Sequence, residues 1–155
     1  QLKLSYNADT GSHKEWVDAV CNSINNVMGN NKACVGGPIG TFADFRSQVS
    51  TQKMTGPWRA GWQMDYPLIQ NFLQPLYYTN APSNDGKWTN QDFDDLVDKA
   101  NAETDKAKAI TTFQDAEKVL VEQMPSIPLW YQNGSAGYSE RVSNVELNPF
   151  SVPVY

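Results

Sequence analysis

The N-terminal part of the chain carries the pattern that most constrains the fold: a strand, a long helix and a second strand in close succession. Residues 2–6 alternate apolar and polar side chains, so they are predicted to form a strand with one buried face. The helix is predicted to begin at Ser12, which forms a capping-box pattern with Glu15, and to end at Gly29. An apolar stripe supports this helix: Trp16, Val17, Val20, Ile24, Val27 and Met28. A short strand over residues 33–35 completes a predicted βαβ unit.

Further helices are predicted from residues that favour helix starts. Thr41 is expected to cap one helix, with Asp44 at its third helical position. Asn90 and Thr104 are expected to cap two more. Because strands and helices alternate along the chain, we predict an α/β protein.

The remaining segments are predicted to be loops and short strands. Residues 80–90 are expected to form an exposed loop, and Asp92 and Asp94 after it to be caps and solvent-facing charges rather than a metal site. Pro125 is expected to stop the last helix and to push Met124 toward extended geometry. Strands are expected from Trp58, over residues 127–131 and over residues 136–138.

Length and composition are those of one globular domain. The 155 residues are 40% hydrophobic and 19% charged, and residues 1–155 are expected to form a single domain. The formal net charge of -5 argues against nucleic acid as a partner, because binding to phosphates requires clustered Lys and Arg. No apolar run approaches the roughly 20 residues that cross a bilayer.

The two cysteines and the many Asn, Ser, Thr, Tyr and Trp residues are typical of a protein that works outside the cytoplasm. The chain begins at Gln1 without a methionine or a signal segment, so we expect a processed product or a piece of a longer protein. A disulfide between Cys21 and Cys34 would close a loop of about 14 residues and stabilise the fold by roughly 3 kcal/mol. Two buried free thiols are the alternative.

The segment from Trp58 to Pro67 concentrates side chains that bind ligands. Indole rings accept flat groups and cations, the Arg59 guanidinium can pair with a carboxylate, and the Asp65 carboxylate can accept hydrogen bonds from an ammonium group. In a fully extended segment Arg59 and Asp65 would lie about 20 Å apart, so they are not expected to pair. We expect the strand to end near Gly61 and Trp62, which would place Trp62 and Asp65 where crevices form.

The patterns of common catalytic sites are not found in the sequence. The only histidine, His13, lies in the capping-box pattern and is expected to be exposed, which argues against a His-based triad or a multi-histidine metal site. Residues 134–137 lack the spacing of a nucleophile elbow, and the adjacent Asp94 and Asp95 do not match a glycosidase pair. We therefore expect a binding protein, not an enzyme, with no metal and no cofactor.

Several motifs, taken in order, carry a family resemblance over most of the chain. They are Arg59-Ala60-Gly61-Trp62 with Asp65-Tyr66-Pro67 and Phe72-Leu73, Trp88-Thr89-Asn90 with Phe93-Asp94 and Leu96, Thr104-Asp105 with Ala116-Glu117, and Met124-Pro125-Ser126-Ile127-Pro128-Leu129. In this order they resemble the oligopeptide- and dipeptide-binding family of ABC-transporter solute-binding proteins. The opening Tyr6-Asn7 and Ser12-His13-Lys14 fit the C-terminal lobe of that family.

The resemblance implies that the chain is the C-terminal lobe of a bilobal periplasmic-binding-protein-like clamp, with a mixed β-sheet flanked by helices. The N-terminal lobe of the same protein would lie outside this chain, and hinge closure would trap the ligand between the lobes. The implied function is to capture oligopeptides or dipeptides and deliver them to the ABC permease subunits of the membrane. The implied location is extracytoplasmic, either at the cell surface through a lipid anchor on the missing N-terminus or in the periplasm.

The resemblance also implies roles for three residues. In peptide-binding members, the aspartate matching Asp65 holds the α-ammonium group, and the residues matching Trp62 and Arg59 line the site. Tyr66 is a further ligand-binding candidate. From the residues alone, Asp65 could instead cap a helix that Pro67 begins, while Trp62, Tyr66 and Arg59 could belong to the core or brace the fold.

Two other functions stay open at this point. The same fold could bind another solute, such as an oligosaccharide, an opine or a metal chelate, since Trp62 could stack on a sugar. The chain could also belong to a cell-surface interaction domain without a transport role. Asp65 separates a peptide from a neutral sugar, because only a free peptide N-terminus needs its carboxylate.

Overall fold

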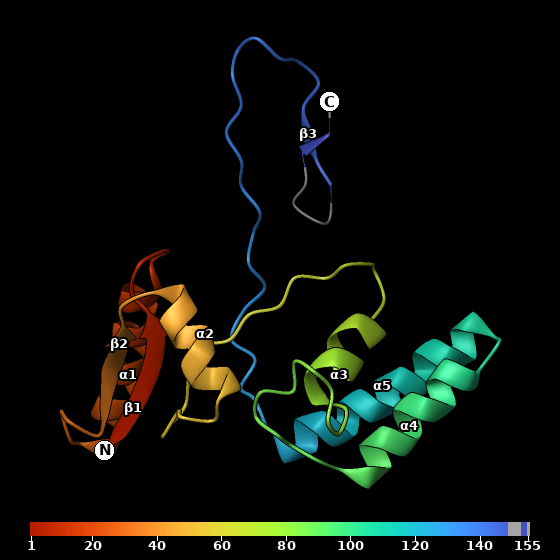
Figure 1. Ribbon diagram of the computed structural model, residues 1–155, viewed down its shortest axis with the longest axis horizontal. Coiled ribbons are helices and arrows are strands. Elements are labelled where there is room, and N and C mark those ends of the chain that lie inside the picture. Colours follow the sequence, from red (N-terminus) through yellow and green to blue (C-terminus); the bar gives the residue numbers. More distant parts are fainter. Residues whose placement is uncertain (149–152, 155) are drawn as a thin grey trace. The chain divides into compact units, whose positions relative to one another are not determined.

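The computed structural model describes residues 1–148 and 153–154. The chain divides into two compact units, the N-terminal unit, Gln1–Gly61, and the C-terminal unit, Trp62–Tyr155 (Figure 1). Each unit has its own cluster of buried apolar side chains. The expectation that residues 1–155 form a single domain stays a prediction.

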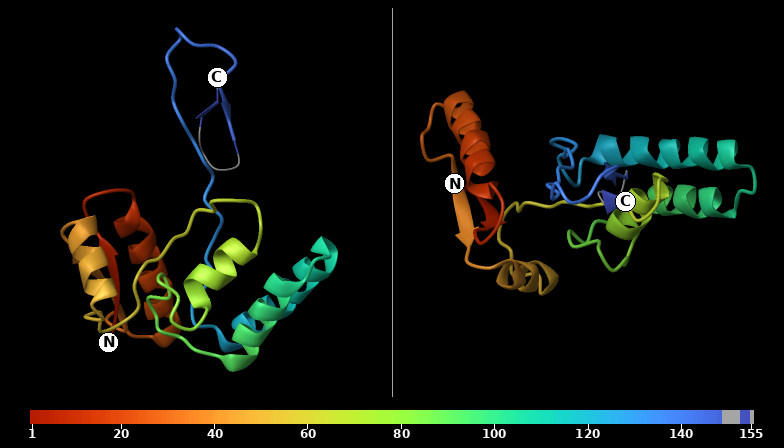
Figure 2. Two further views of the ribbon diagram at one scale, coloured as in Figure 1. Left: turned by 45° about the vertical axis from the view of Figure 1, so that its right-hand side comes forward. Right: turned by 90° about the horizontal axis from the view of Figure 1, so that it is seen from above.

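The N-terminal unit is a βαβ unit followed by one helix (Figure 2). Strand β1, Leu2–Asn7, pairs in parallel with strand β2, Cys34–Ile39, and helix α1, His13–Met28, connects them. Helix α2, Phe42–Ser50, follows β2 and contacts both strands. The predicted βαβ unit is confirmed, and with it the α/β class, as a small parallel two-stranded sheet with helices.

The register of the sheet runs from Leu2 opposite Cys34 to Asn7 opposite Ile39. In the second half of β1 both faces are buried, since Leu4 and Tyr6 join the core while Ser5 and Asn7 are 8% and 1% exposed. The prediction of one buried face is therefore wrong for these residues. The alternating pattern could not reveal that α2 packs on the strands as well as α1.

A third segment lies beside β1 without forming a full strand. The Ser5 N–H donates to the Pro57 carbonyl at 2.9 Å, and the Arg59 N–H donates to the Ser5 carbonyl at 2.8 Å. Trp58 thereby forms a single parallel bridge with Ser5. The strand predicted from Trp58 is reduced to this one bridge.

A disulfide and an asparagine tie the start of β2 to α1. Cys21 of α1 and Cys34 of β2 are bridged, which confirms the predicted disulfide. Beside the bridge, Asn25 Oδ1 accepts a hydrogen bond from the Cys34 N–H at 2.7 Å, and Asn25 Nδ2 donates to the Cys34 carbonyl at 3.1 Å. The alternative of two free thiols is wrong.

All three predicted helix ends in this unit are confirmed in position, and one of them lacks its predicted side-chain cap. Thr41 has an extended backbone, and its Oγ1 accepts a hydrogen bond from the Asp44 N–H at 3.0 Å. Gly29 ends α1 with a φ of 60°, a conformation in which glycine has no steric penalty. Ser12, at ψ 42°, makes no side-chain capping hydrogen bond, so the capping box does not form.

The described residues of the C-terminal unit form three helices and a short pair of strands. Helix α3 spans Gln70–Tyr77, helix α4 spans Gln91–Ala102 and helix α5 spans Lys106–Gln123. Strand β3, Glu146–Leu147, pairs antiparallel with strand β4, Pro153–Val154. Helices α4 and α5 lie side by side in every view (Figure 2). The buried core is formed by Leu73, Phe93, Val97, Ala100, Phe113 and Ala116. Over the part of the chain that the structure describes, no helix combines the length and hydrophobicity of a membrane span.

The caps of α4 and α5 differ in how well they were predicted. Asn90 caps α4 as expected, with its Oδ1 accepting a hydrogen bond from the Phe93 N–H at 2.9 Å. Helix α5 is capped by Asp105 rather than Thr104, because Asp105 Oδ1 accepts hydrogen bonds from two backbone N–H groups of the first turn, at 2.9 and 3.2 Å. The prediction is wrong by one residue.

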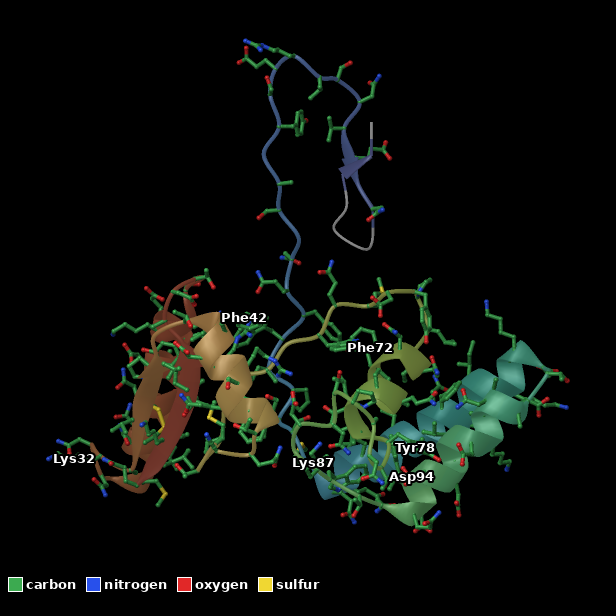
Figure 3. All side chains as sticks on the ribbon, in the orientation of Figure 1. Lys32, Phe42, Phe72, Tyr78, Lys87 and Asp94 are labelled. Atoms are coloured by element: carbon green, nitrogen blue, oxygen red, sulfur yellow. A yellow bond between two sulfur atoms is a disulfide. The ribbon has the colours of Figure 1, made fainter. Side chains whose placement is uncertain are left out.

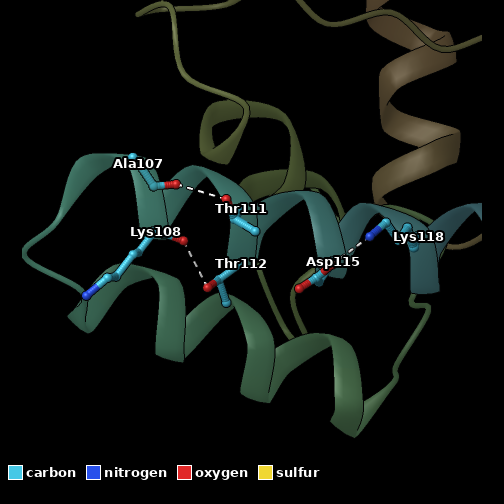
Figure 4. Close-up of polar contacts among 6 residues, drawn as sticks. All are labelled: Ala107, Lys108, Thr111, Thr112, Asp115 and Lys118. Carbon is cyan, nitrogen blue, oxygen red and sulfur yellow. Dashed lines mark hydrogen bonds and ion pairs between the residues drawn. The ribbon is translucent and has the colours of Figure 1, made fainter.

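Polar side chains on the exposed face of α5 bond within the helix (Figure 4). The hydroxyls of Thr111 and Thr112 each donate to a carbonyl one turn earlier, at 3.0 Å. Lys118 pairs with Asp115 at 2.7 Å. Such exposed contacts contribute little, so α5 is held to α4 mainly by buried residues such as Phe113.

The loop between α3 and α4 forms where it was predicted, but it is exposed only in part. Its Asn84 is 2% exposed. Asn84 Nδ2 donates to the carbonyls of Tyr77, Tyr78 and Trp88 at 3.3, 3.1 and 2.7 Å. Asn84 Oδ1 accepts from the Trp88 N–H at 3.2 Å. One buried amide therefore holds the loop closed.

Asp94, expected to face solvent, is also buried, at 7% exposure. Its Oδ1 accepts a hydrogen bond from the Thr79 N–H at 3.1 Å, and one turn later Asp98 Oδ2 accepts from the Tyr78 hydroxyl at 3.0 Å. Figure 3 shows Tyr78 and Asp94 near one another. The prediction for Asp94 is wrong because the chain leaving α3 packs over the first turns of α4.

The strands predicted over residues 127–131 and 136–138 do not form among the described residues. Met124 ends α5 with a φ of 47°, a left-handed rather than an extended conformation. After it, Ile127 is 74% and Tyr131 100% exposed. A strand requires a second strand to receive its backbone hydrogen bonds, and the described part of this unit supplies none to these segments.

Candidate functional site

The predicted ligand-binding residues are divided between the two units. Arg59 belongs to the N-terminal unit, whereas Trp62, Asp65 and Tyr66 belong to the C-terminal unit. Their roles stay predictions. The surroundings of each group show what it can bind.

Arg59 places a half-buried guanidinium group beside β1. Burial lowers the pKa of Arg59, and no carboxylate among residues 1–61 forms an ion pair with it. Removing a charge from water is costly unless the charge is paired. The guanidinium is therefore suited to bind an anionic group such as a carboxylate.

His13, at the start of α1, is near enough to Arg59 for the two charges to interact. Burial lowers the pKa of His13 and the positive charge of Arg59 lowers it further, against the opposing effect of nearby carboxylates. Its Nδ1 accepts a hydrogen bond from Trp16 Nε1 at 3.3 Å. The prediction that His13 is exposed is wrong, since it is half-buried. Its nearness to Arg59 was not predicted, because the two residues are far apart in the sequence.

A buried asparagine, Asn7, and exposed polar residues lie at the carboxyl end of β1. Asn7 Nδ2 donates to Asp9 Oδ1 at 2.9 Å and to Thr10 Oγ1 at 3.1 Å, whereas Asn7 Oδ1 is buried without a partner among the described residues. Asp9 Oδ2 accepts from the Phe42 N–H at 2.9 Å, and the hydrogen bond from Asn7 is the main cause that lowers the pKa of Asp9. Ligands of α/β proteins bind at the carboxyl ends of strands, so this end of the sheet is a suitable position for a site.

In the C-terminal unit, Asn71 of α3 contacts two of the predicted site residues. Trp62 Nε1 donates to the Asn71 carbonyl at 2.9 Å. The Asp65 N–H donates to Asn71 Oδ1 at 2.8 Å, and Asn71 Nδ2 donates to Asp65 Oδ2 at 3.2 Å. Asn71 is 5% exposed and Trp62 38% exposed, so one buried residue supports an exposed indole through its main chain and an exposed carboxylate through its side chain.

Asp65 does not cap a helix. Helix α3 begins at Gln70 after Ile69, and no side chain caps its first turn. The alternative in which Asp65 caps a helix begun at Pro67 is therefore wrong. Among the described residues Asp65 Oδ1 accepts no hydrogen bond, which leaves it available to an ammonium group.

Tyr66 lines a shallow groove that runs along α3 to Pro82, with a volume of about 510 Å³. All ten residues that line the groove are uncharged. The Tyr66 hydroxyl donates to Gln70 Oε1, and Gln70 Nε2 donates to Gln74 Oε1. Hydroxyl and amide groups can bond a peptide backbone or a sugar. No group of His, Cys, Asp or Glu suited to a metal ion occurs in the described ranges.

Comparison with known proteins identifies relatives along nearly the whole chain. No protein-family model matches it. The oligopeptide-binding protein OppA of Bacillus subtilis is 27% identical over 145 residues, which cover 94% of this chain and 26% of OppA. Heme-binding protein A of Haemophilus influenzae is 28% identical over 116 residues, which cover 74% of this chain and 21% of that protein. The chain thus spans about a quarter or less of the length of these relatives.

Solved structures share the fold. The Escherichia coli murein tripeptide binding protein MppA aligns with a TM-score of 0.70 and 23% identity, over 80% of this chain and 23% of that one. The unliganded open form of MppA, named there as periplasmic, aligns with a TM-score of 0.68. By its sequence, this chain is similar to a segment of the oligopeptide- and dipeptide-binding proteins of ABC transporters, and its α/β fold matches part of their solved structures.

Proposed function

We propose that the protein to which this segment belongs binds oligopeptides or dipeptides and delivers them to an ABC importer. The observation that carries the proposal is the similarity to OppA over 94% of the chain. The named relatives are binding proteins rather than enzymes, which agrees with the absence of a catalytic pattern in the sequence.

We further propose that the chain is the C-terminal lobe of a bilobal clamp, in which its strands belong to a mixed β-sheet flanked by helices. The N-terminal lobe would supply the opposite wall of the cleft, and the closed form would bind the membrane permease. The unliganded open form recorded for MppA supports a clamp that opens and closes. The periplasmic location in its name supports an extracytoplasmic protein, in the periplasm or anchored at the cell surface.

Each unit of the chain, taken by itself, offers one charged group that is suited to a charged group of a peptide. Asp65 would bind the α-ammonium group through its open carboxylate oxygen. Arg59, with His13 beside it, would bind a carboxylate. A charge-assisted hydrogen bond of this kind contributes roughly 1.5 to 3 kcal/mol. Trp62 and Tyr66 would line the site near Asp65.

A different cargo is the second candidate, because one relative is named as a heme-binding protein. In this version of the clamp, Trp62 would pack on a flat metal chelate, and Asp65 would not meet an ammonium group. The candidates differ most in their dependence on Asp65.

The test uses the full-length protein and the cargo that it retains during purification. Mass spectrometry after mild denaturation should detect peptides, whereas a saccharide or a metal chelate would contradict the proposal. In calorimetric titration, Asp65→Asn should weaken binding of a tripeptide with a free N-terminus by roughly 10- to 150-fold. Asp92→Asn removes the same charge from an exposed position of α4 and should leave the affinity unchanged. Equal affinities for both variants would contradict the role of Asp65.

A further inference from the structure

We infer that Asn71 is the positioning residue of the ligand site, and that it sets the direction of the Asp65 carboxylate and the Trp62 indole. The inference rests on the proposed function, since it assigns the residue that prepares Asp65 for an ammonium group. Asn71 would not touch the ligand through its side-chain amide. It would act through the two residues that it holds.

The side chain of Asn71 bonds Asp65 twice. Its Oδ1 accepts from the Asp65 N–H at 2.8 Å, and its Nδ2 donates to Asp65 Oδ2 at 3.2 Å. The first bond fixes the backbone of Asp65 and the second fixes the rotation of its carboxylate. One carboxylate oxygen is thereby engaged, while Oδ1 accepts nothing from the described residues and stays open to a cation.

The main chain of Asn71 holds the second site residue. Its carbonyl accepts the Trp62 Nε1–H at 2.9 Å. Asn71 is itself anchored, because it is the second residue of α3 and its N–H donates to the Leu68 carbonyl at 3.0 Å. A residue on a helix holds its neighbours more rigidly than one on a loop, which suits a site that must be ready before the ligand arrives.

The two contacts of this position suit a side-chain amide. Only a side chain with both a donor and an acceptor at its tip can bond the N–H and the carboxylate of Asp65 together. Leucine has the same branched shape but no polar atom, so it would leave the Asp65 N–H without its partner and release the carboxylate. Asn71 is 5% exposed, so water cannot easily replace the hydrogen bonds that the leucine variant would lose.

A second buried asparagine of the same unit provides a matched control. Asn84 is 2% exposed and makes four hydrogen bonds through its side chain, but all of them go to backbone groups of Tyr77, Tyr78 and Trp88. Loss of either side chain should destabilise the unit. Only loss of Asn71 should change the recognition of a ligand ammonium group.

The experiment measures selectivity for a free N-terminus in the full-length protein. Calorimetry compares Ala-Ala-Ala with its N-acetylated form in the wild type, Asn71→Leu and Asn84→Leu. Asn71→Leu should weaken binding of the free tripeptide by about tenfold, the equivalent of one lost hydrogen bond to a charged group. It should leave the weaker binding of the acetylated tripeptide unchanged. Asn84→Leu should lower the melting temperature and leave the ratio of the two affinities as in the wild type.

If Asn71→Leu does not fold, Asn71→Ser takes its place. The short serine hydroxyl cannot bond both the Asp65 N–H and the Asp65 carboxylate, so this variant should reduce the same ratio of affinities.

A double-mutant cycle with Asp65→Asn separates positioning from general stability. If Asn71 acts through Asp65, the variant with both changes should bind no more weakly than Asp65→Asn alone. If the affinity losses of the two single variants multiply in the double variant, or if Asn71→Leu weakens both tripeptides equally, the inference is overturned. The proposed function would still stand. A wild type that binds neither tripeptide, or does not distinguish them, would overturn the proposed function and the inference together.

Discussion

The two units of the chain use different interactions to fix the segment that follows a helix. In the N-terminal unit the start of β2 is held by the Cys21–Cys34 disulfide together with Asn25, whereas in the C-terminal unit the loop after α3 is held by Asn84. A disulfide stabilises mainly by restricting the unfolded chain, while a buried amide acts only in the folded state. The two units should therefore respond to different perturbations.

The largest effect is expected from removing the covalent bridge. Cys21→Ala combined with Cys34→Ala should destabilise the N-terminal unit by about 3 kcal/mol, because the unfolded chain regains the entropy that a closed loop denies it. Hydrogen exchange measured by mass spectrometry on the full-length protein should show faster exchange in α1 and β2. Reducing agent should have no effect on the double variant. Equal loss of protection in α4 and α5 would contradict an effect confined to one unit.

An intermediate effect is expected from the amide of the C-terminal unit. Asn84→Ala should cost about 1 to 3 kcal/mol, since it leaves buried carbonyls without a donor. Asn101→Ala is the control, because Asn101 is exposed and its amide donates to Gln74 Oε1 at 3.1 Å in a contact that is open to solvent. Its removal should therefore change stability by less than about 0.5 kcal/mol. Urea denaturation followed by hydrogen exchange in the α3–α4 loop measures both. Similar costs for the two variants would show that Asn84 does not hold the loop.

The smallest effect is expected from pH and should again separate the units. Burial and Arg59 lower the pKa of His13 below its ordinary value of 6.5, so the unfolded chain takes up this proton at a higher pH than the folded one. The stabilising contribution is complete above pH 6.5 and is lost as the pH falls from there through the folded-state pKa.

His13→Gln should remove this part of the pH dependence. Urea midpoints of the N-terminal unit at pH 8 and pH 5 should differ less in His13→Gln than in the wild type. His13 is the only histidine in the sequence, so no other imidazole contributes. An unchanged pH dependence in the variant would show that His13 titrates alike in both states.

The fold was predictable where residues close in sequence are also close in space. Thr41, Asn90 and Gly29 were correctly placed at helix ends, because a cap bonds backbone groups only two to four residues away. The βαβ unit was predictable for the same reason, since its connection is short. Predictions failed at Asn84 and Asp94, whose burial depends on other segments folding over them.

The residues expected to bind the ligand were predictable from the sequence, but the residues that hold them in place were not. Asp65 and Arg59 stood out because their side chains bind charged groups and lie in a recognisable motif. Asn71 did not stand out, since asparagine is frequent in this sequence and only its bonds to Asp65 and Trp62 distinguish it. His13 was placed at a helix start, and only the fold brings it near Arg59.

The sequence by itself determined the α/β class, the order of the first strands and helices, the family resemblance and the charged residues suited to a peptide. Periodicity, caps and motif order are local properties that a linear chain displays directly. The tertiary structure alone decided which polar side chains are buried, which of them hold others in place, and which predicted strands lack a partner. These depend on contacts between distant segments, which form only when the chain folds.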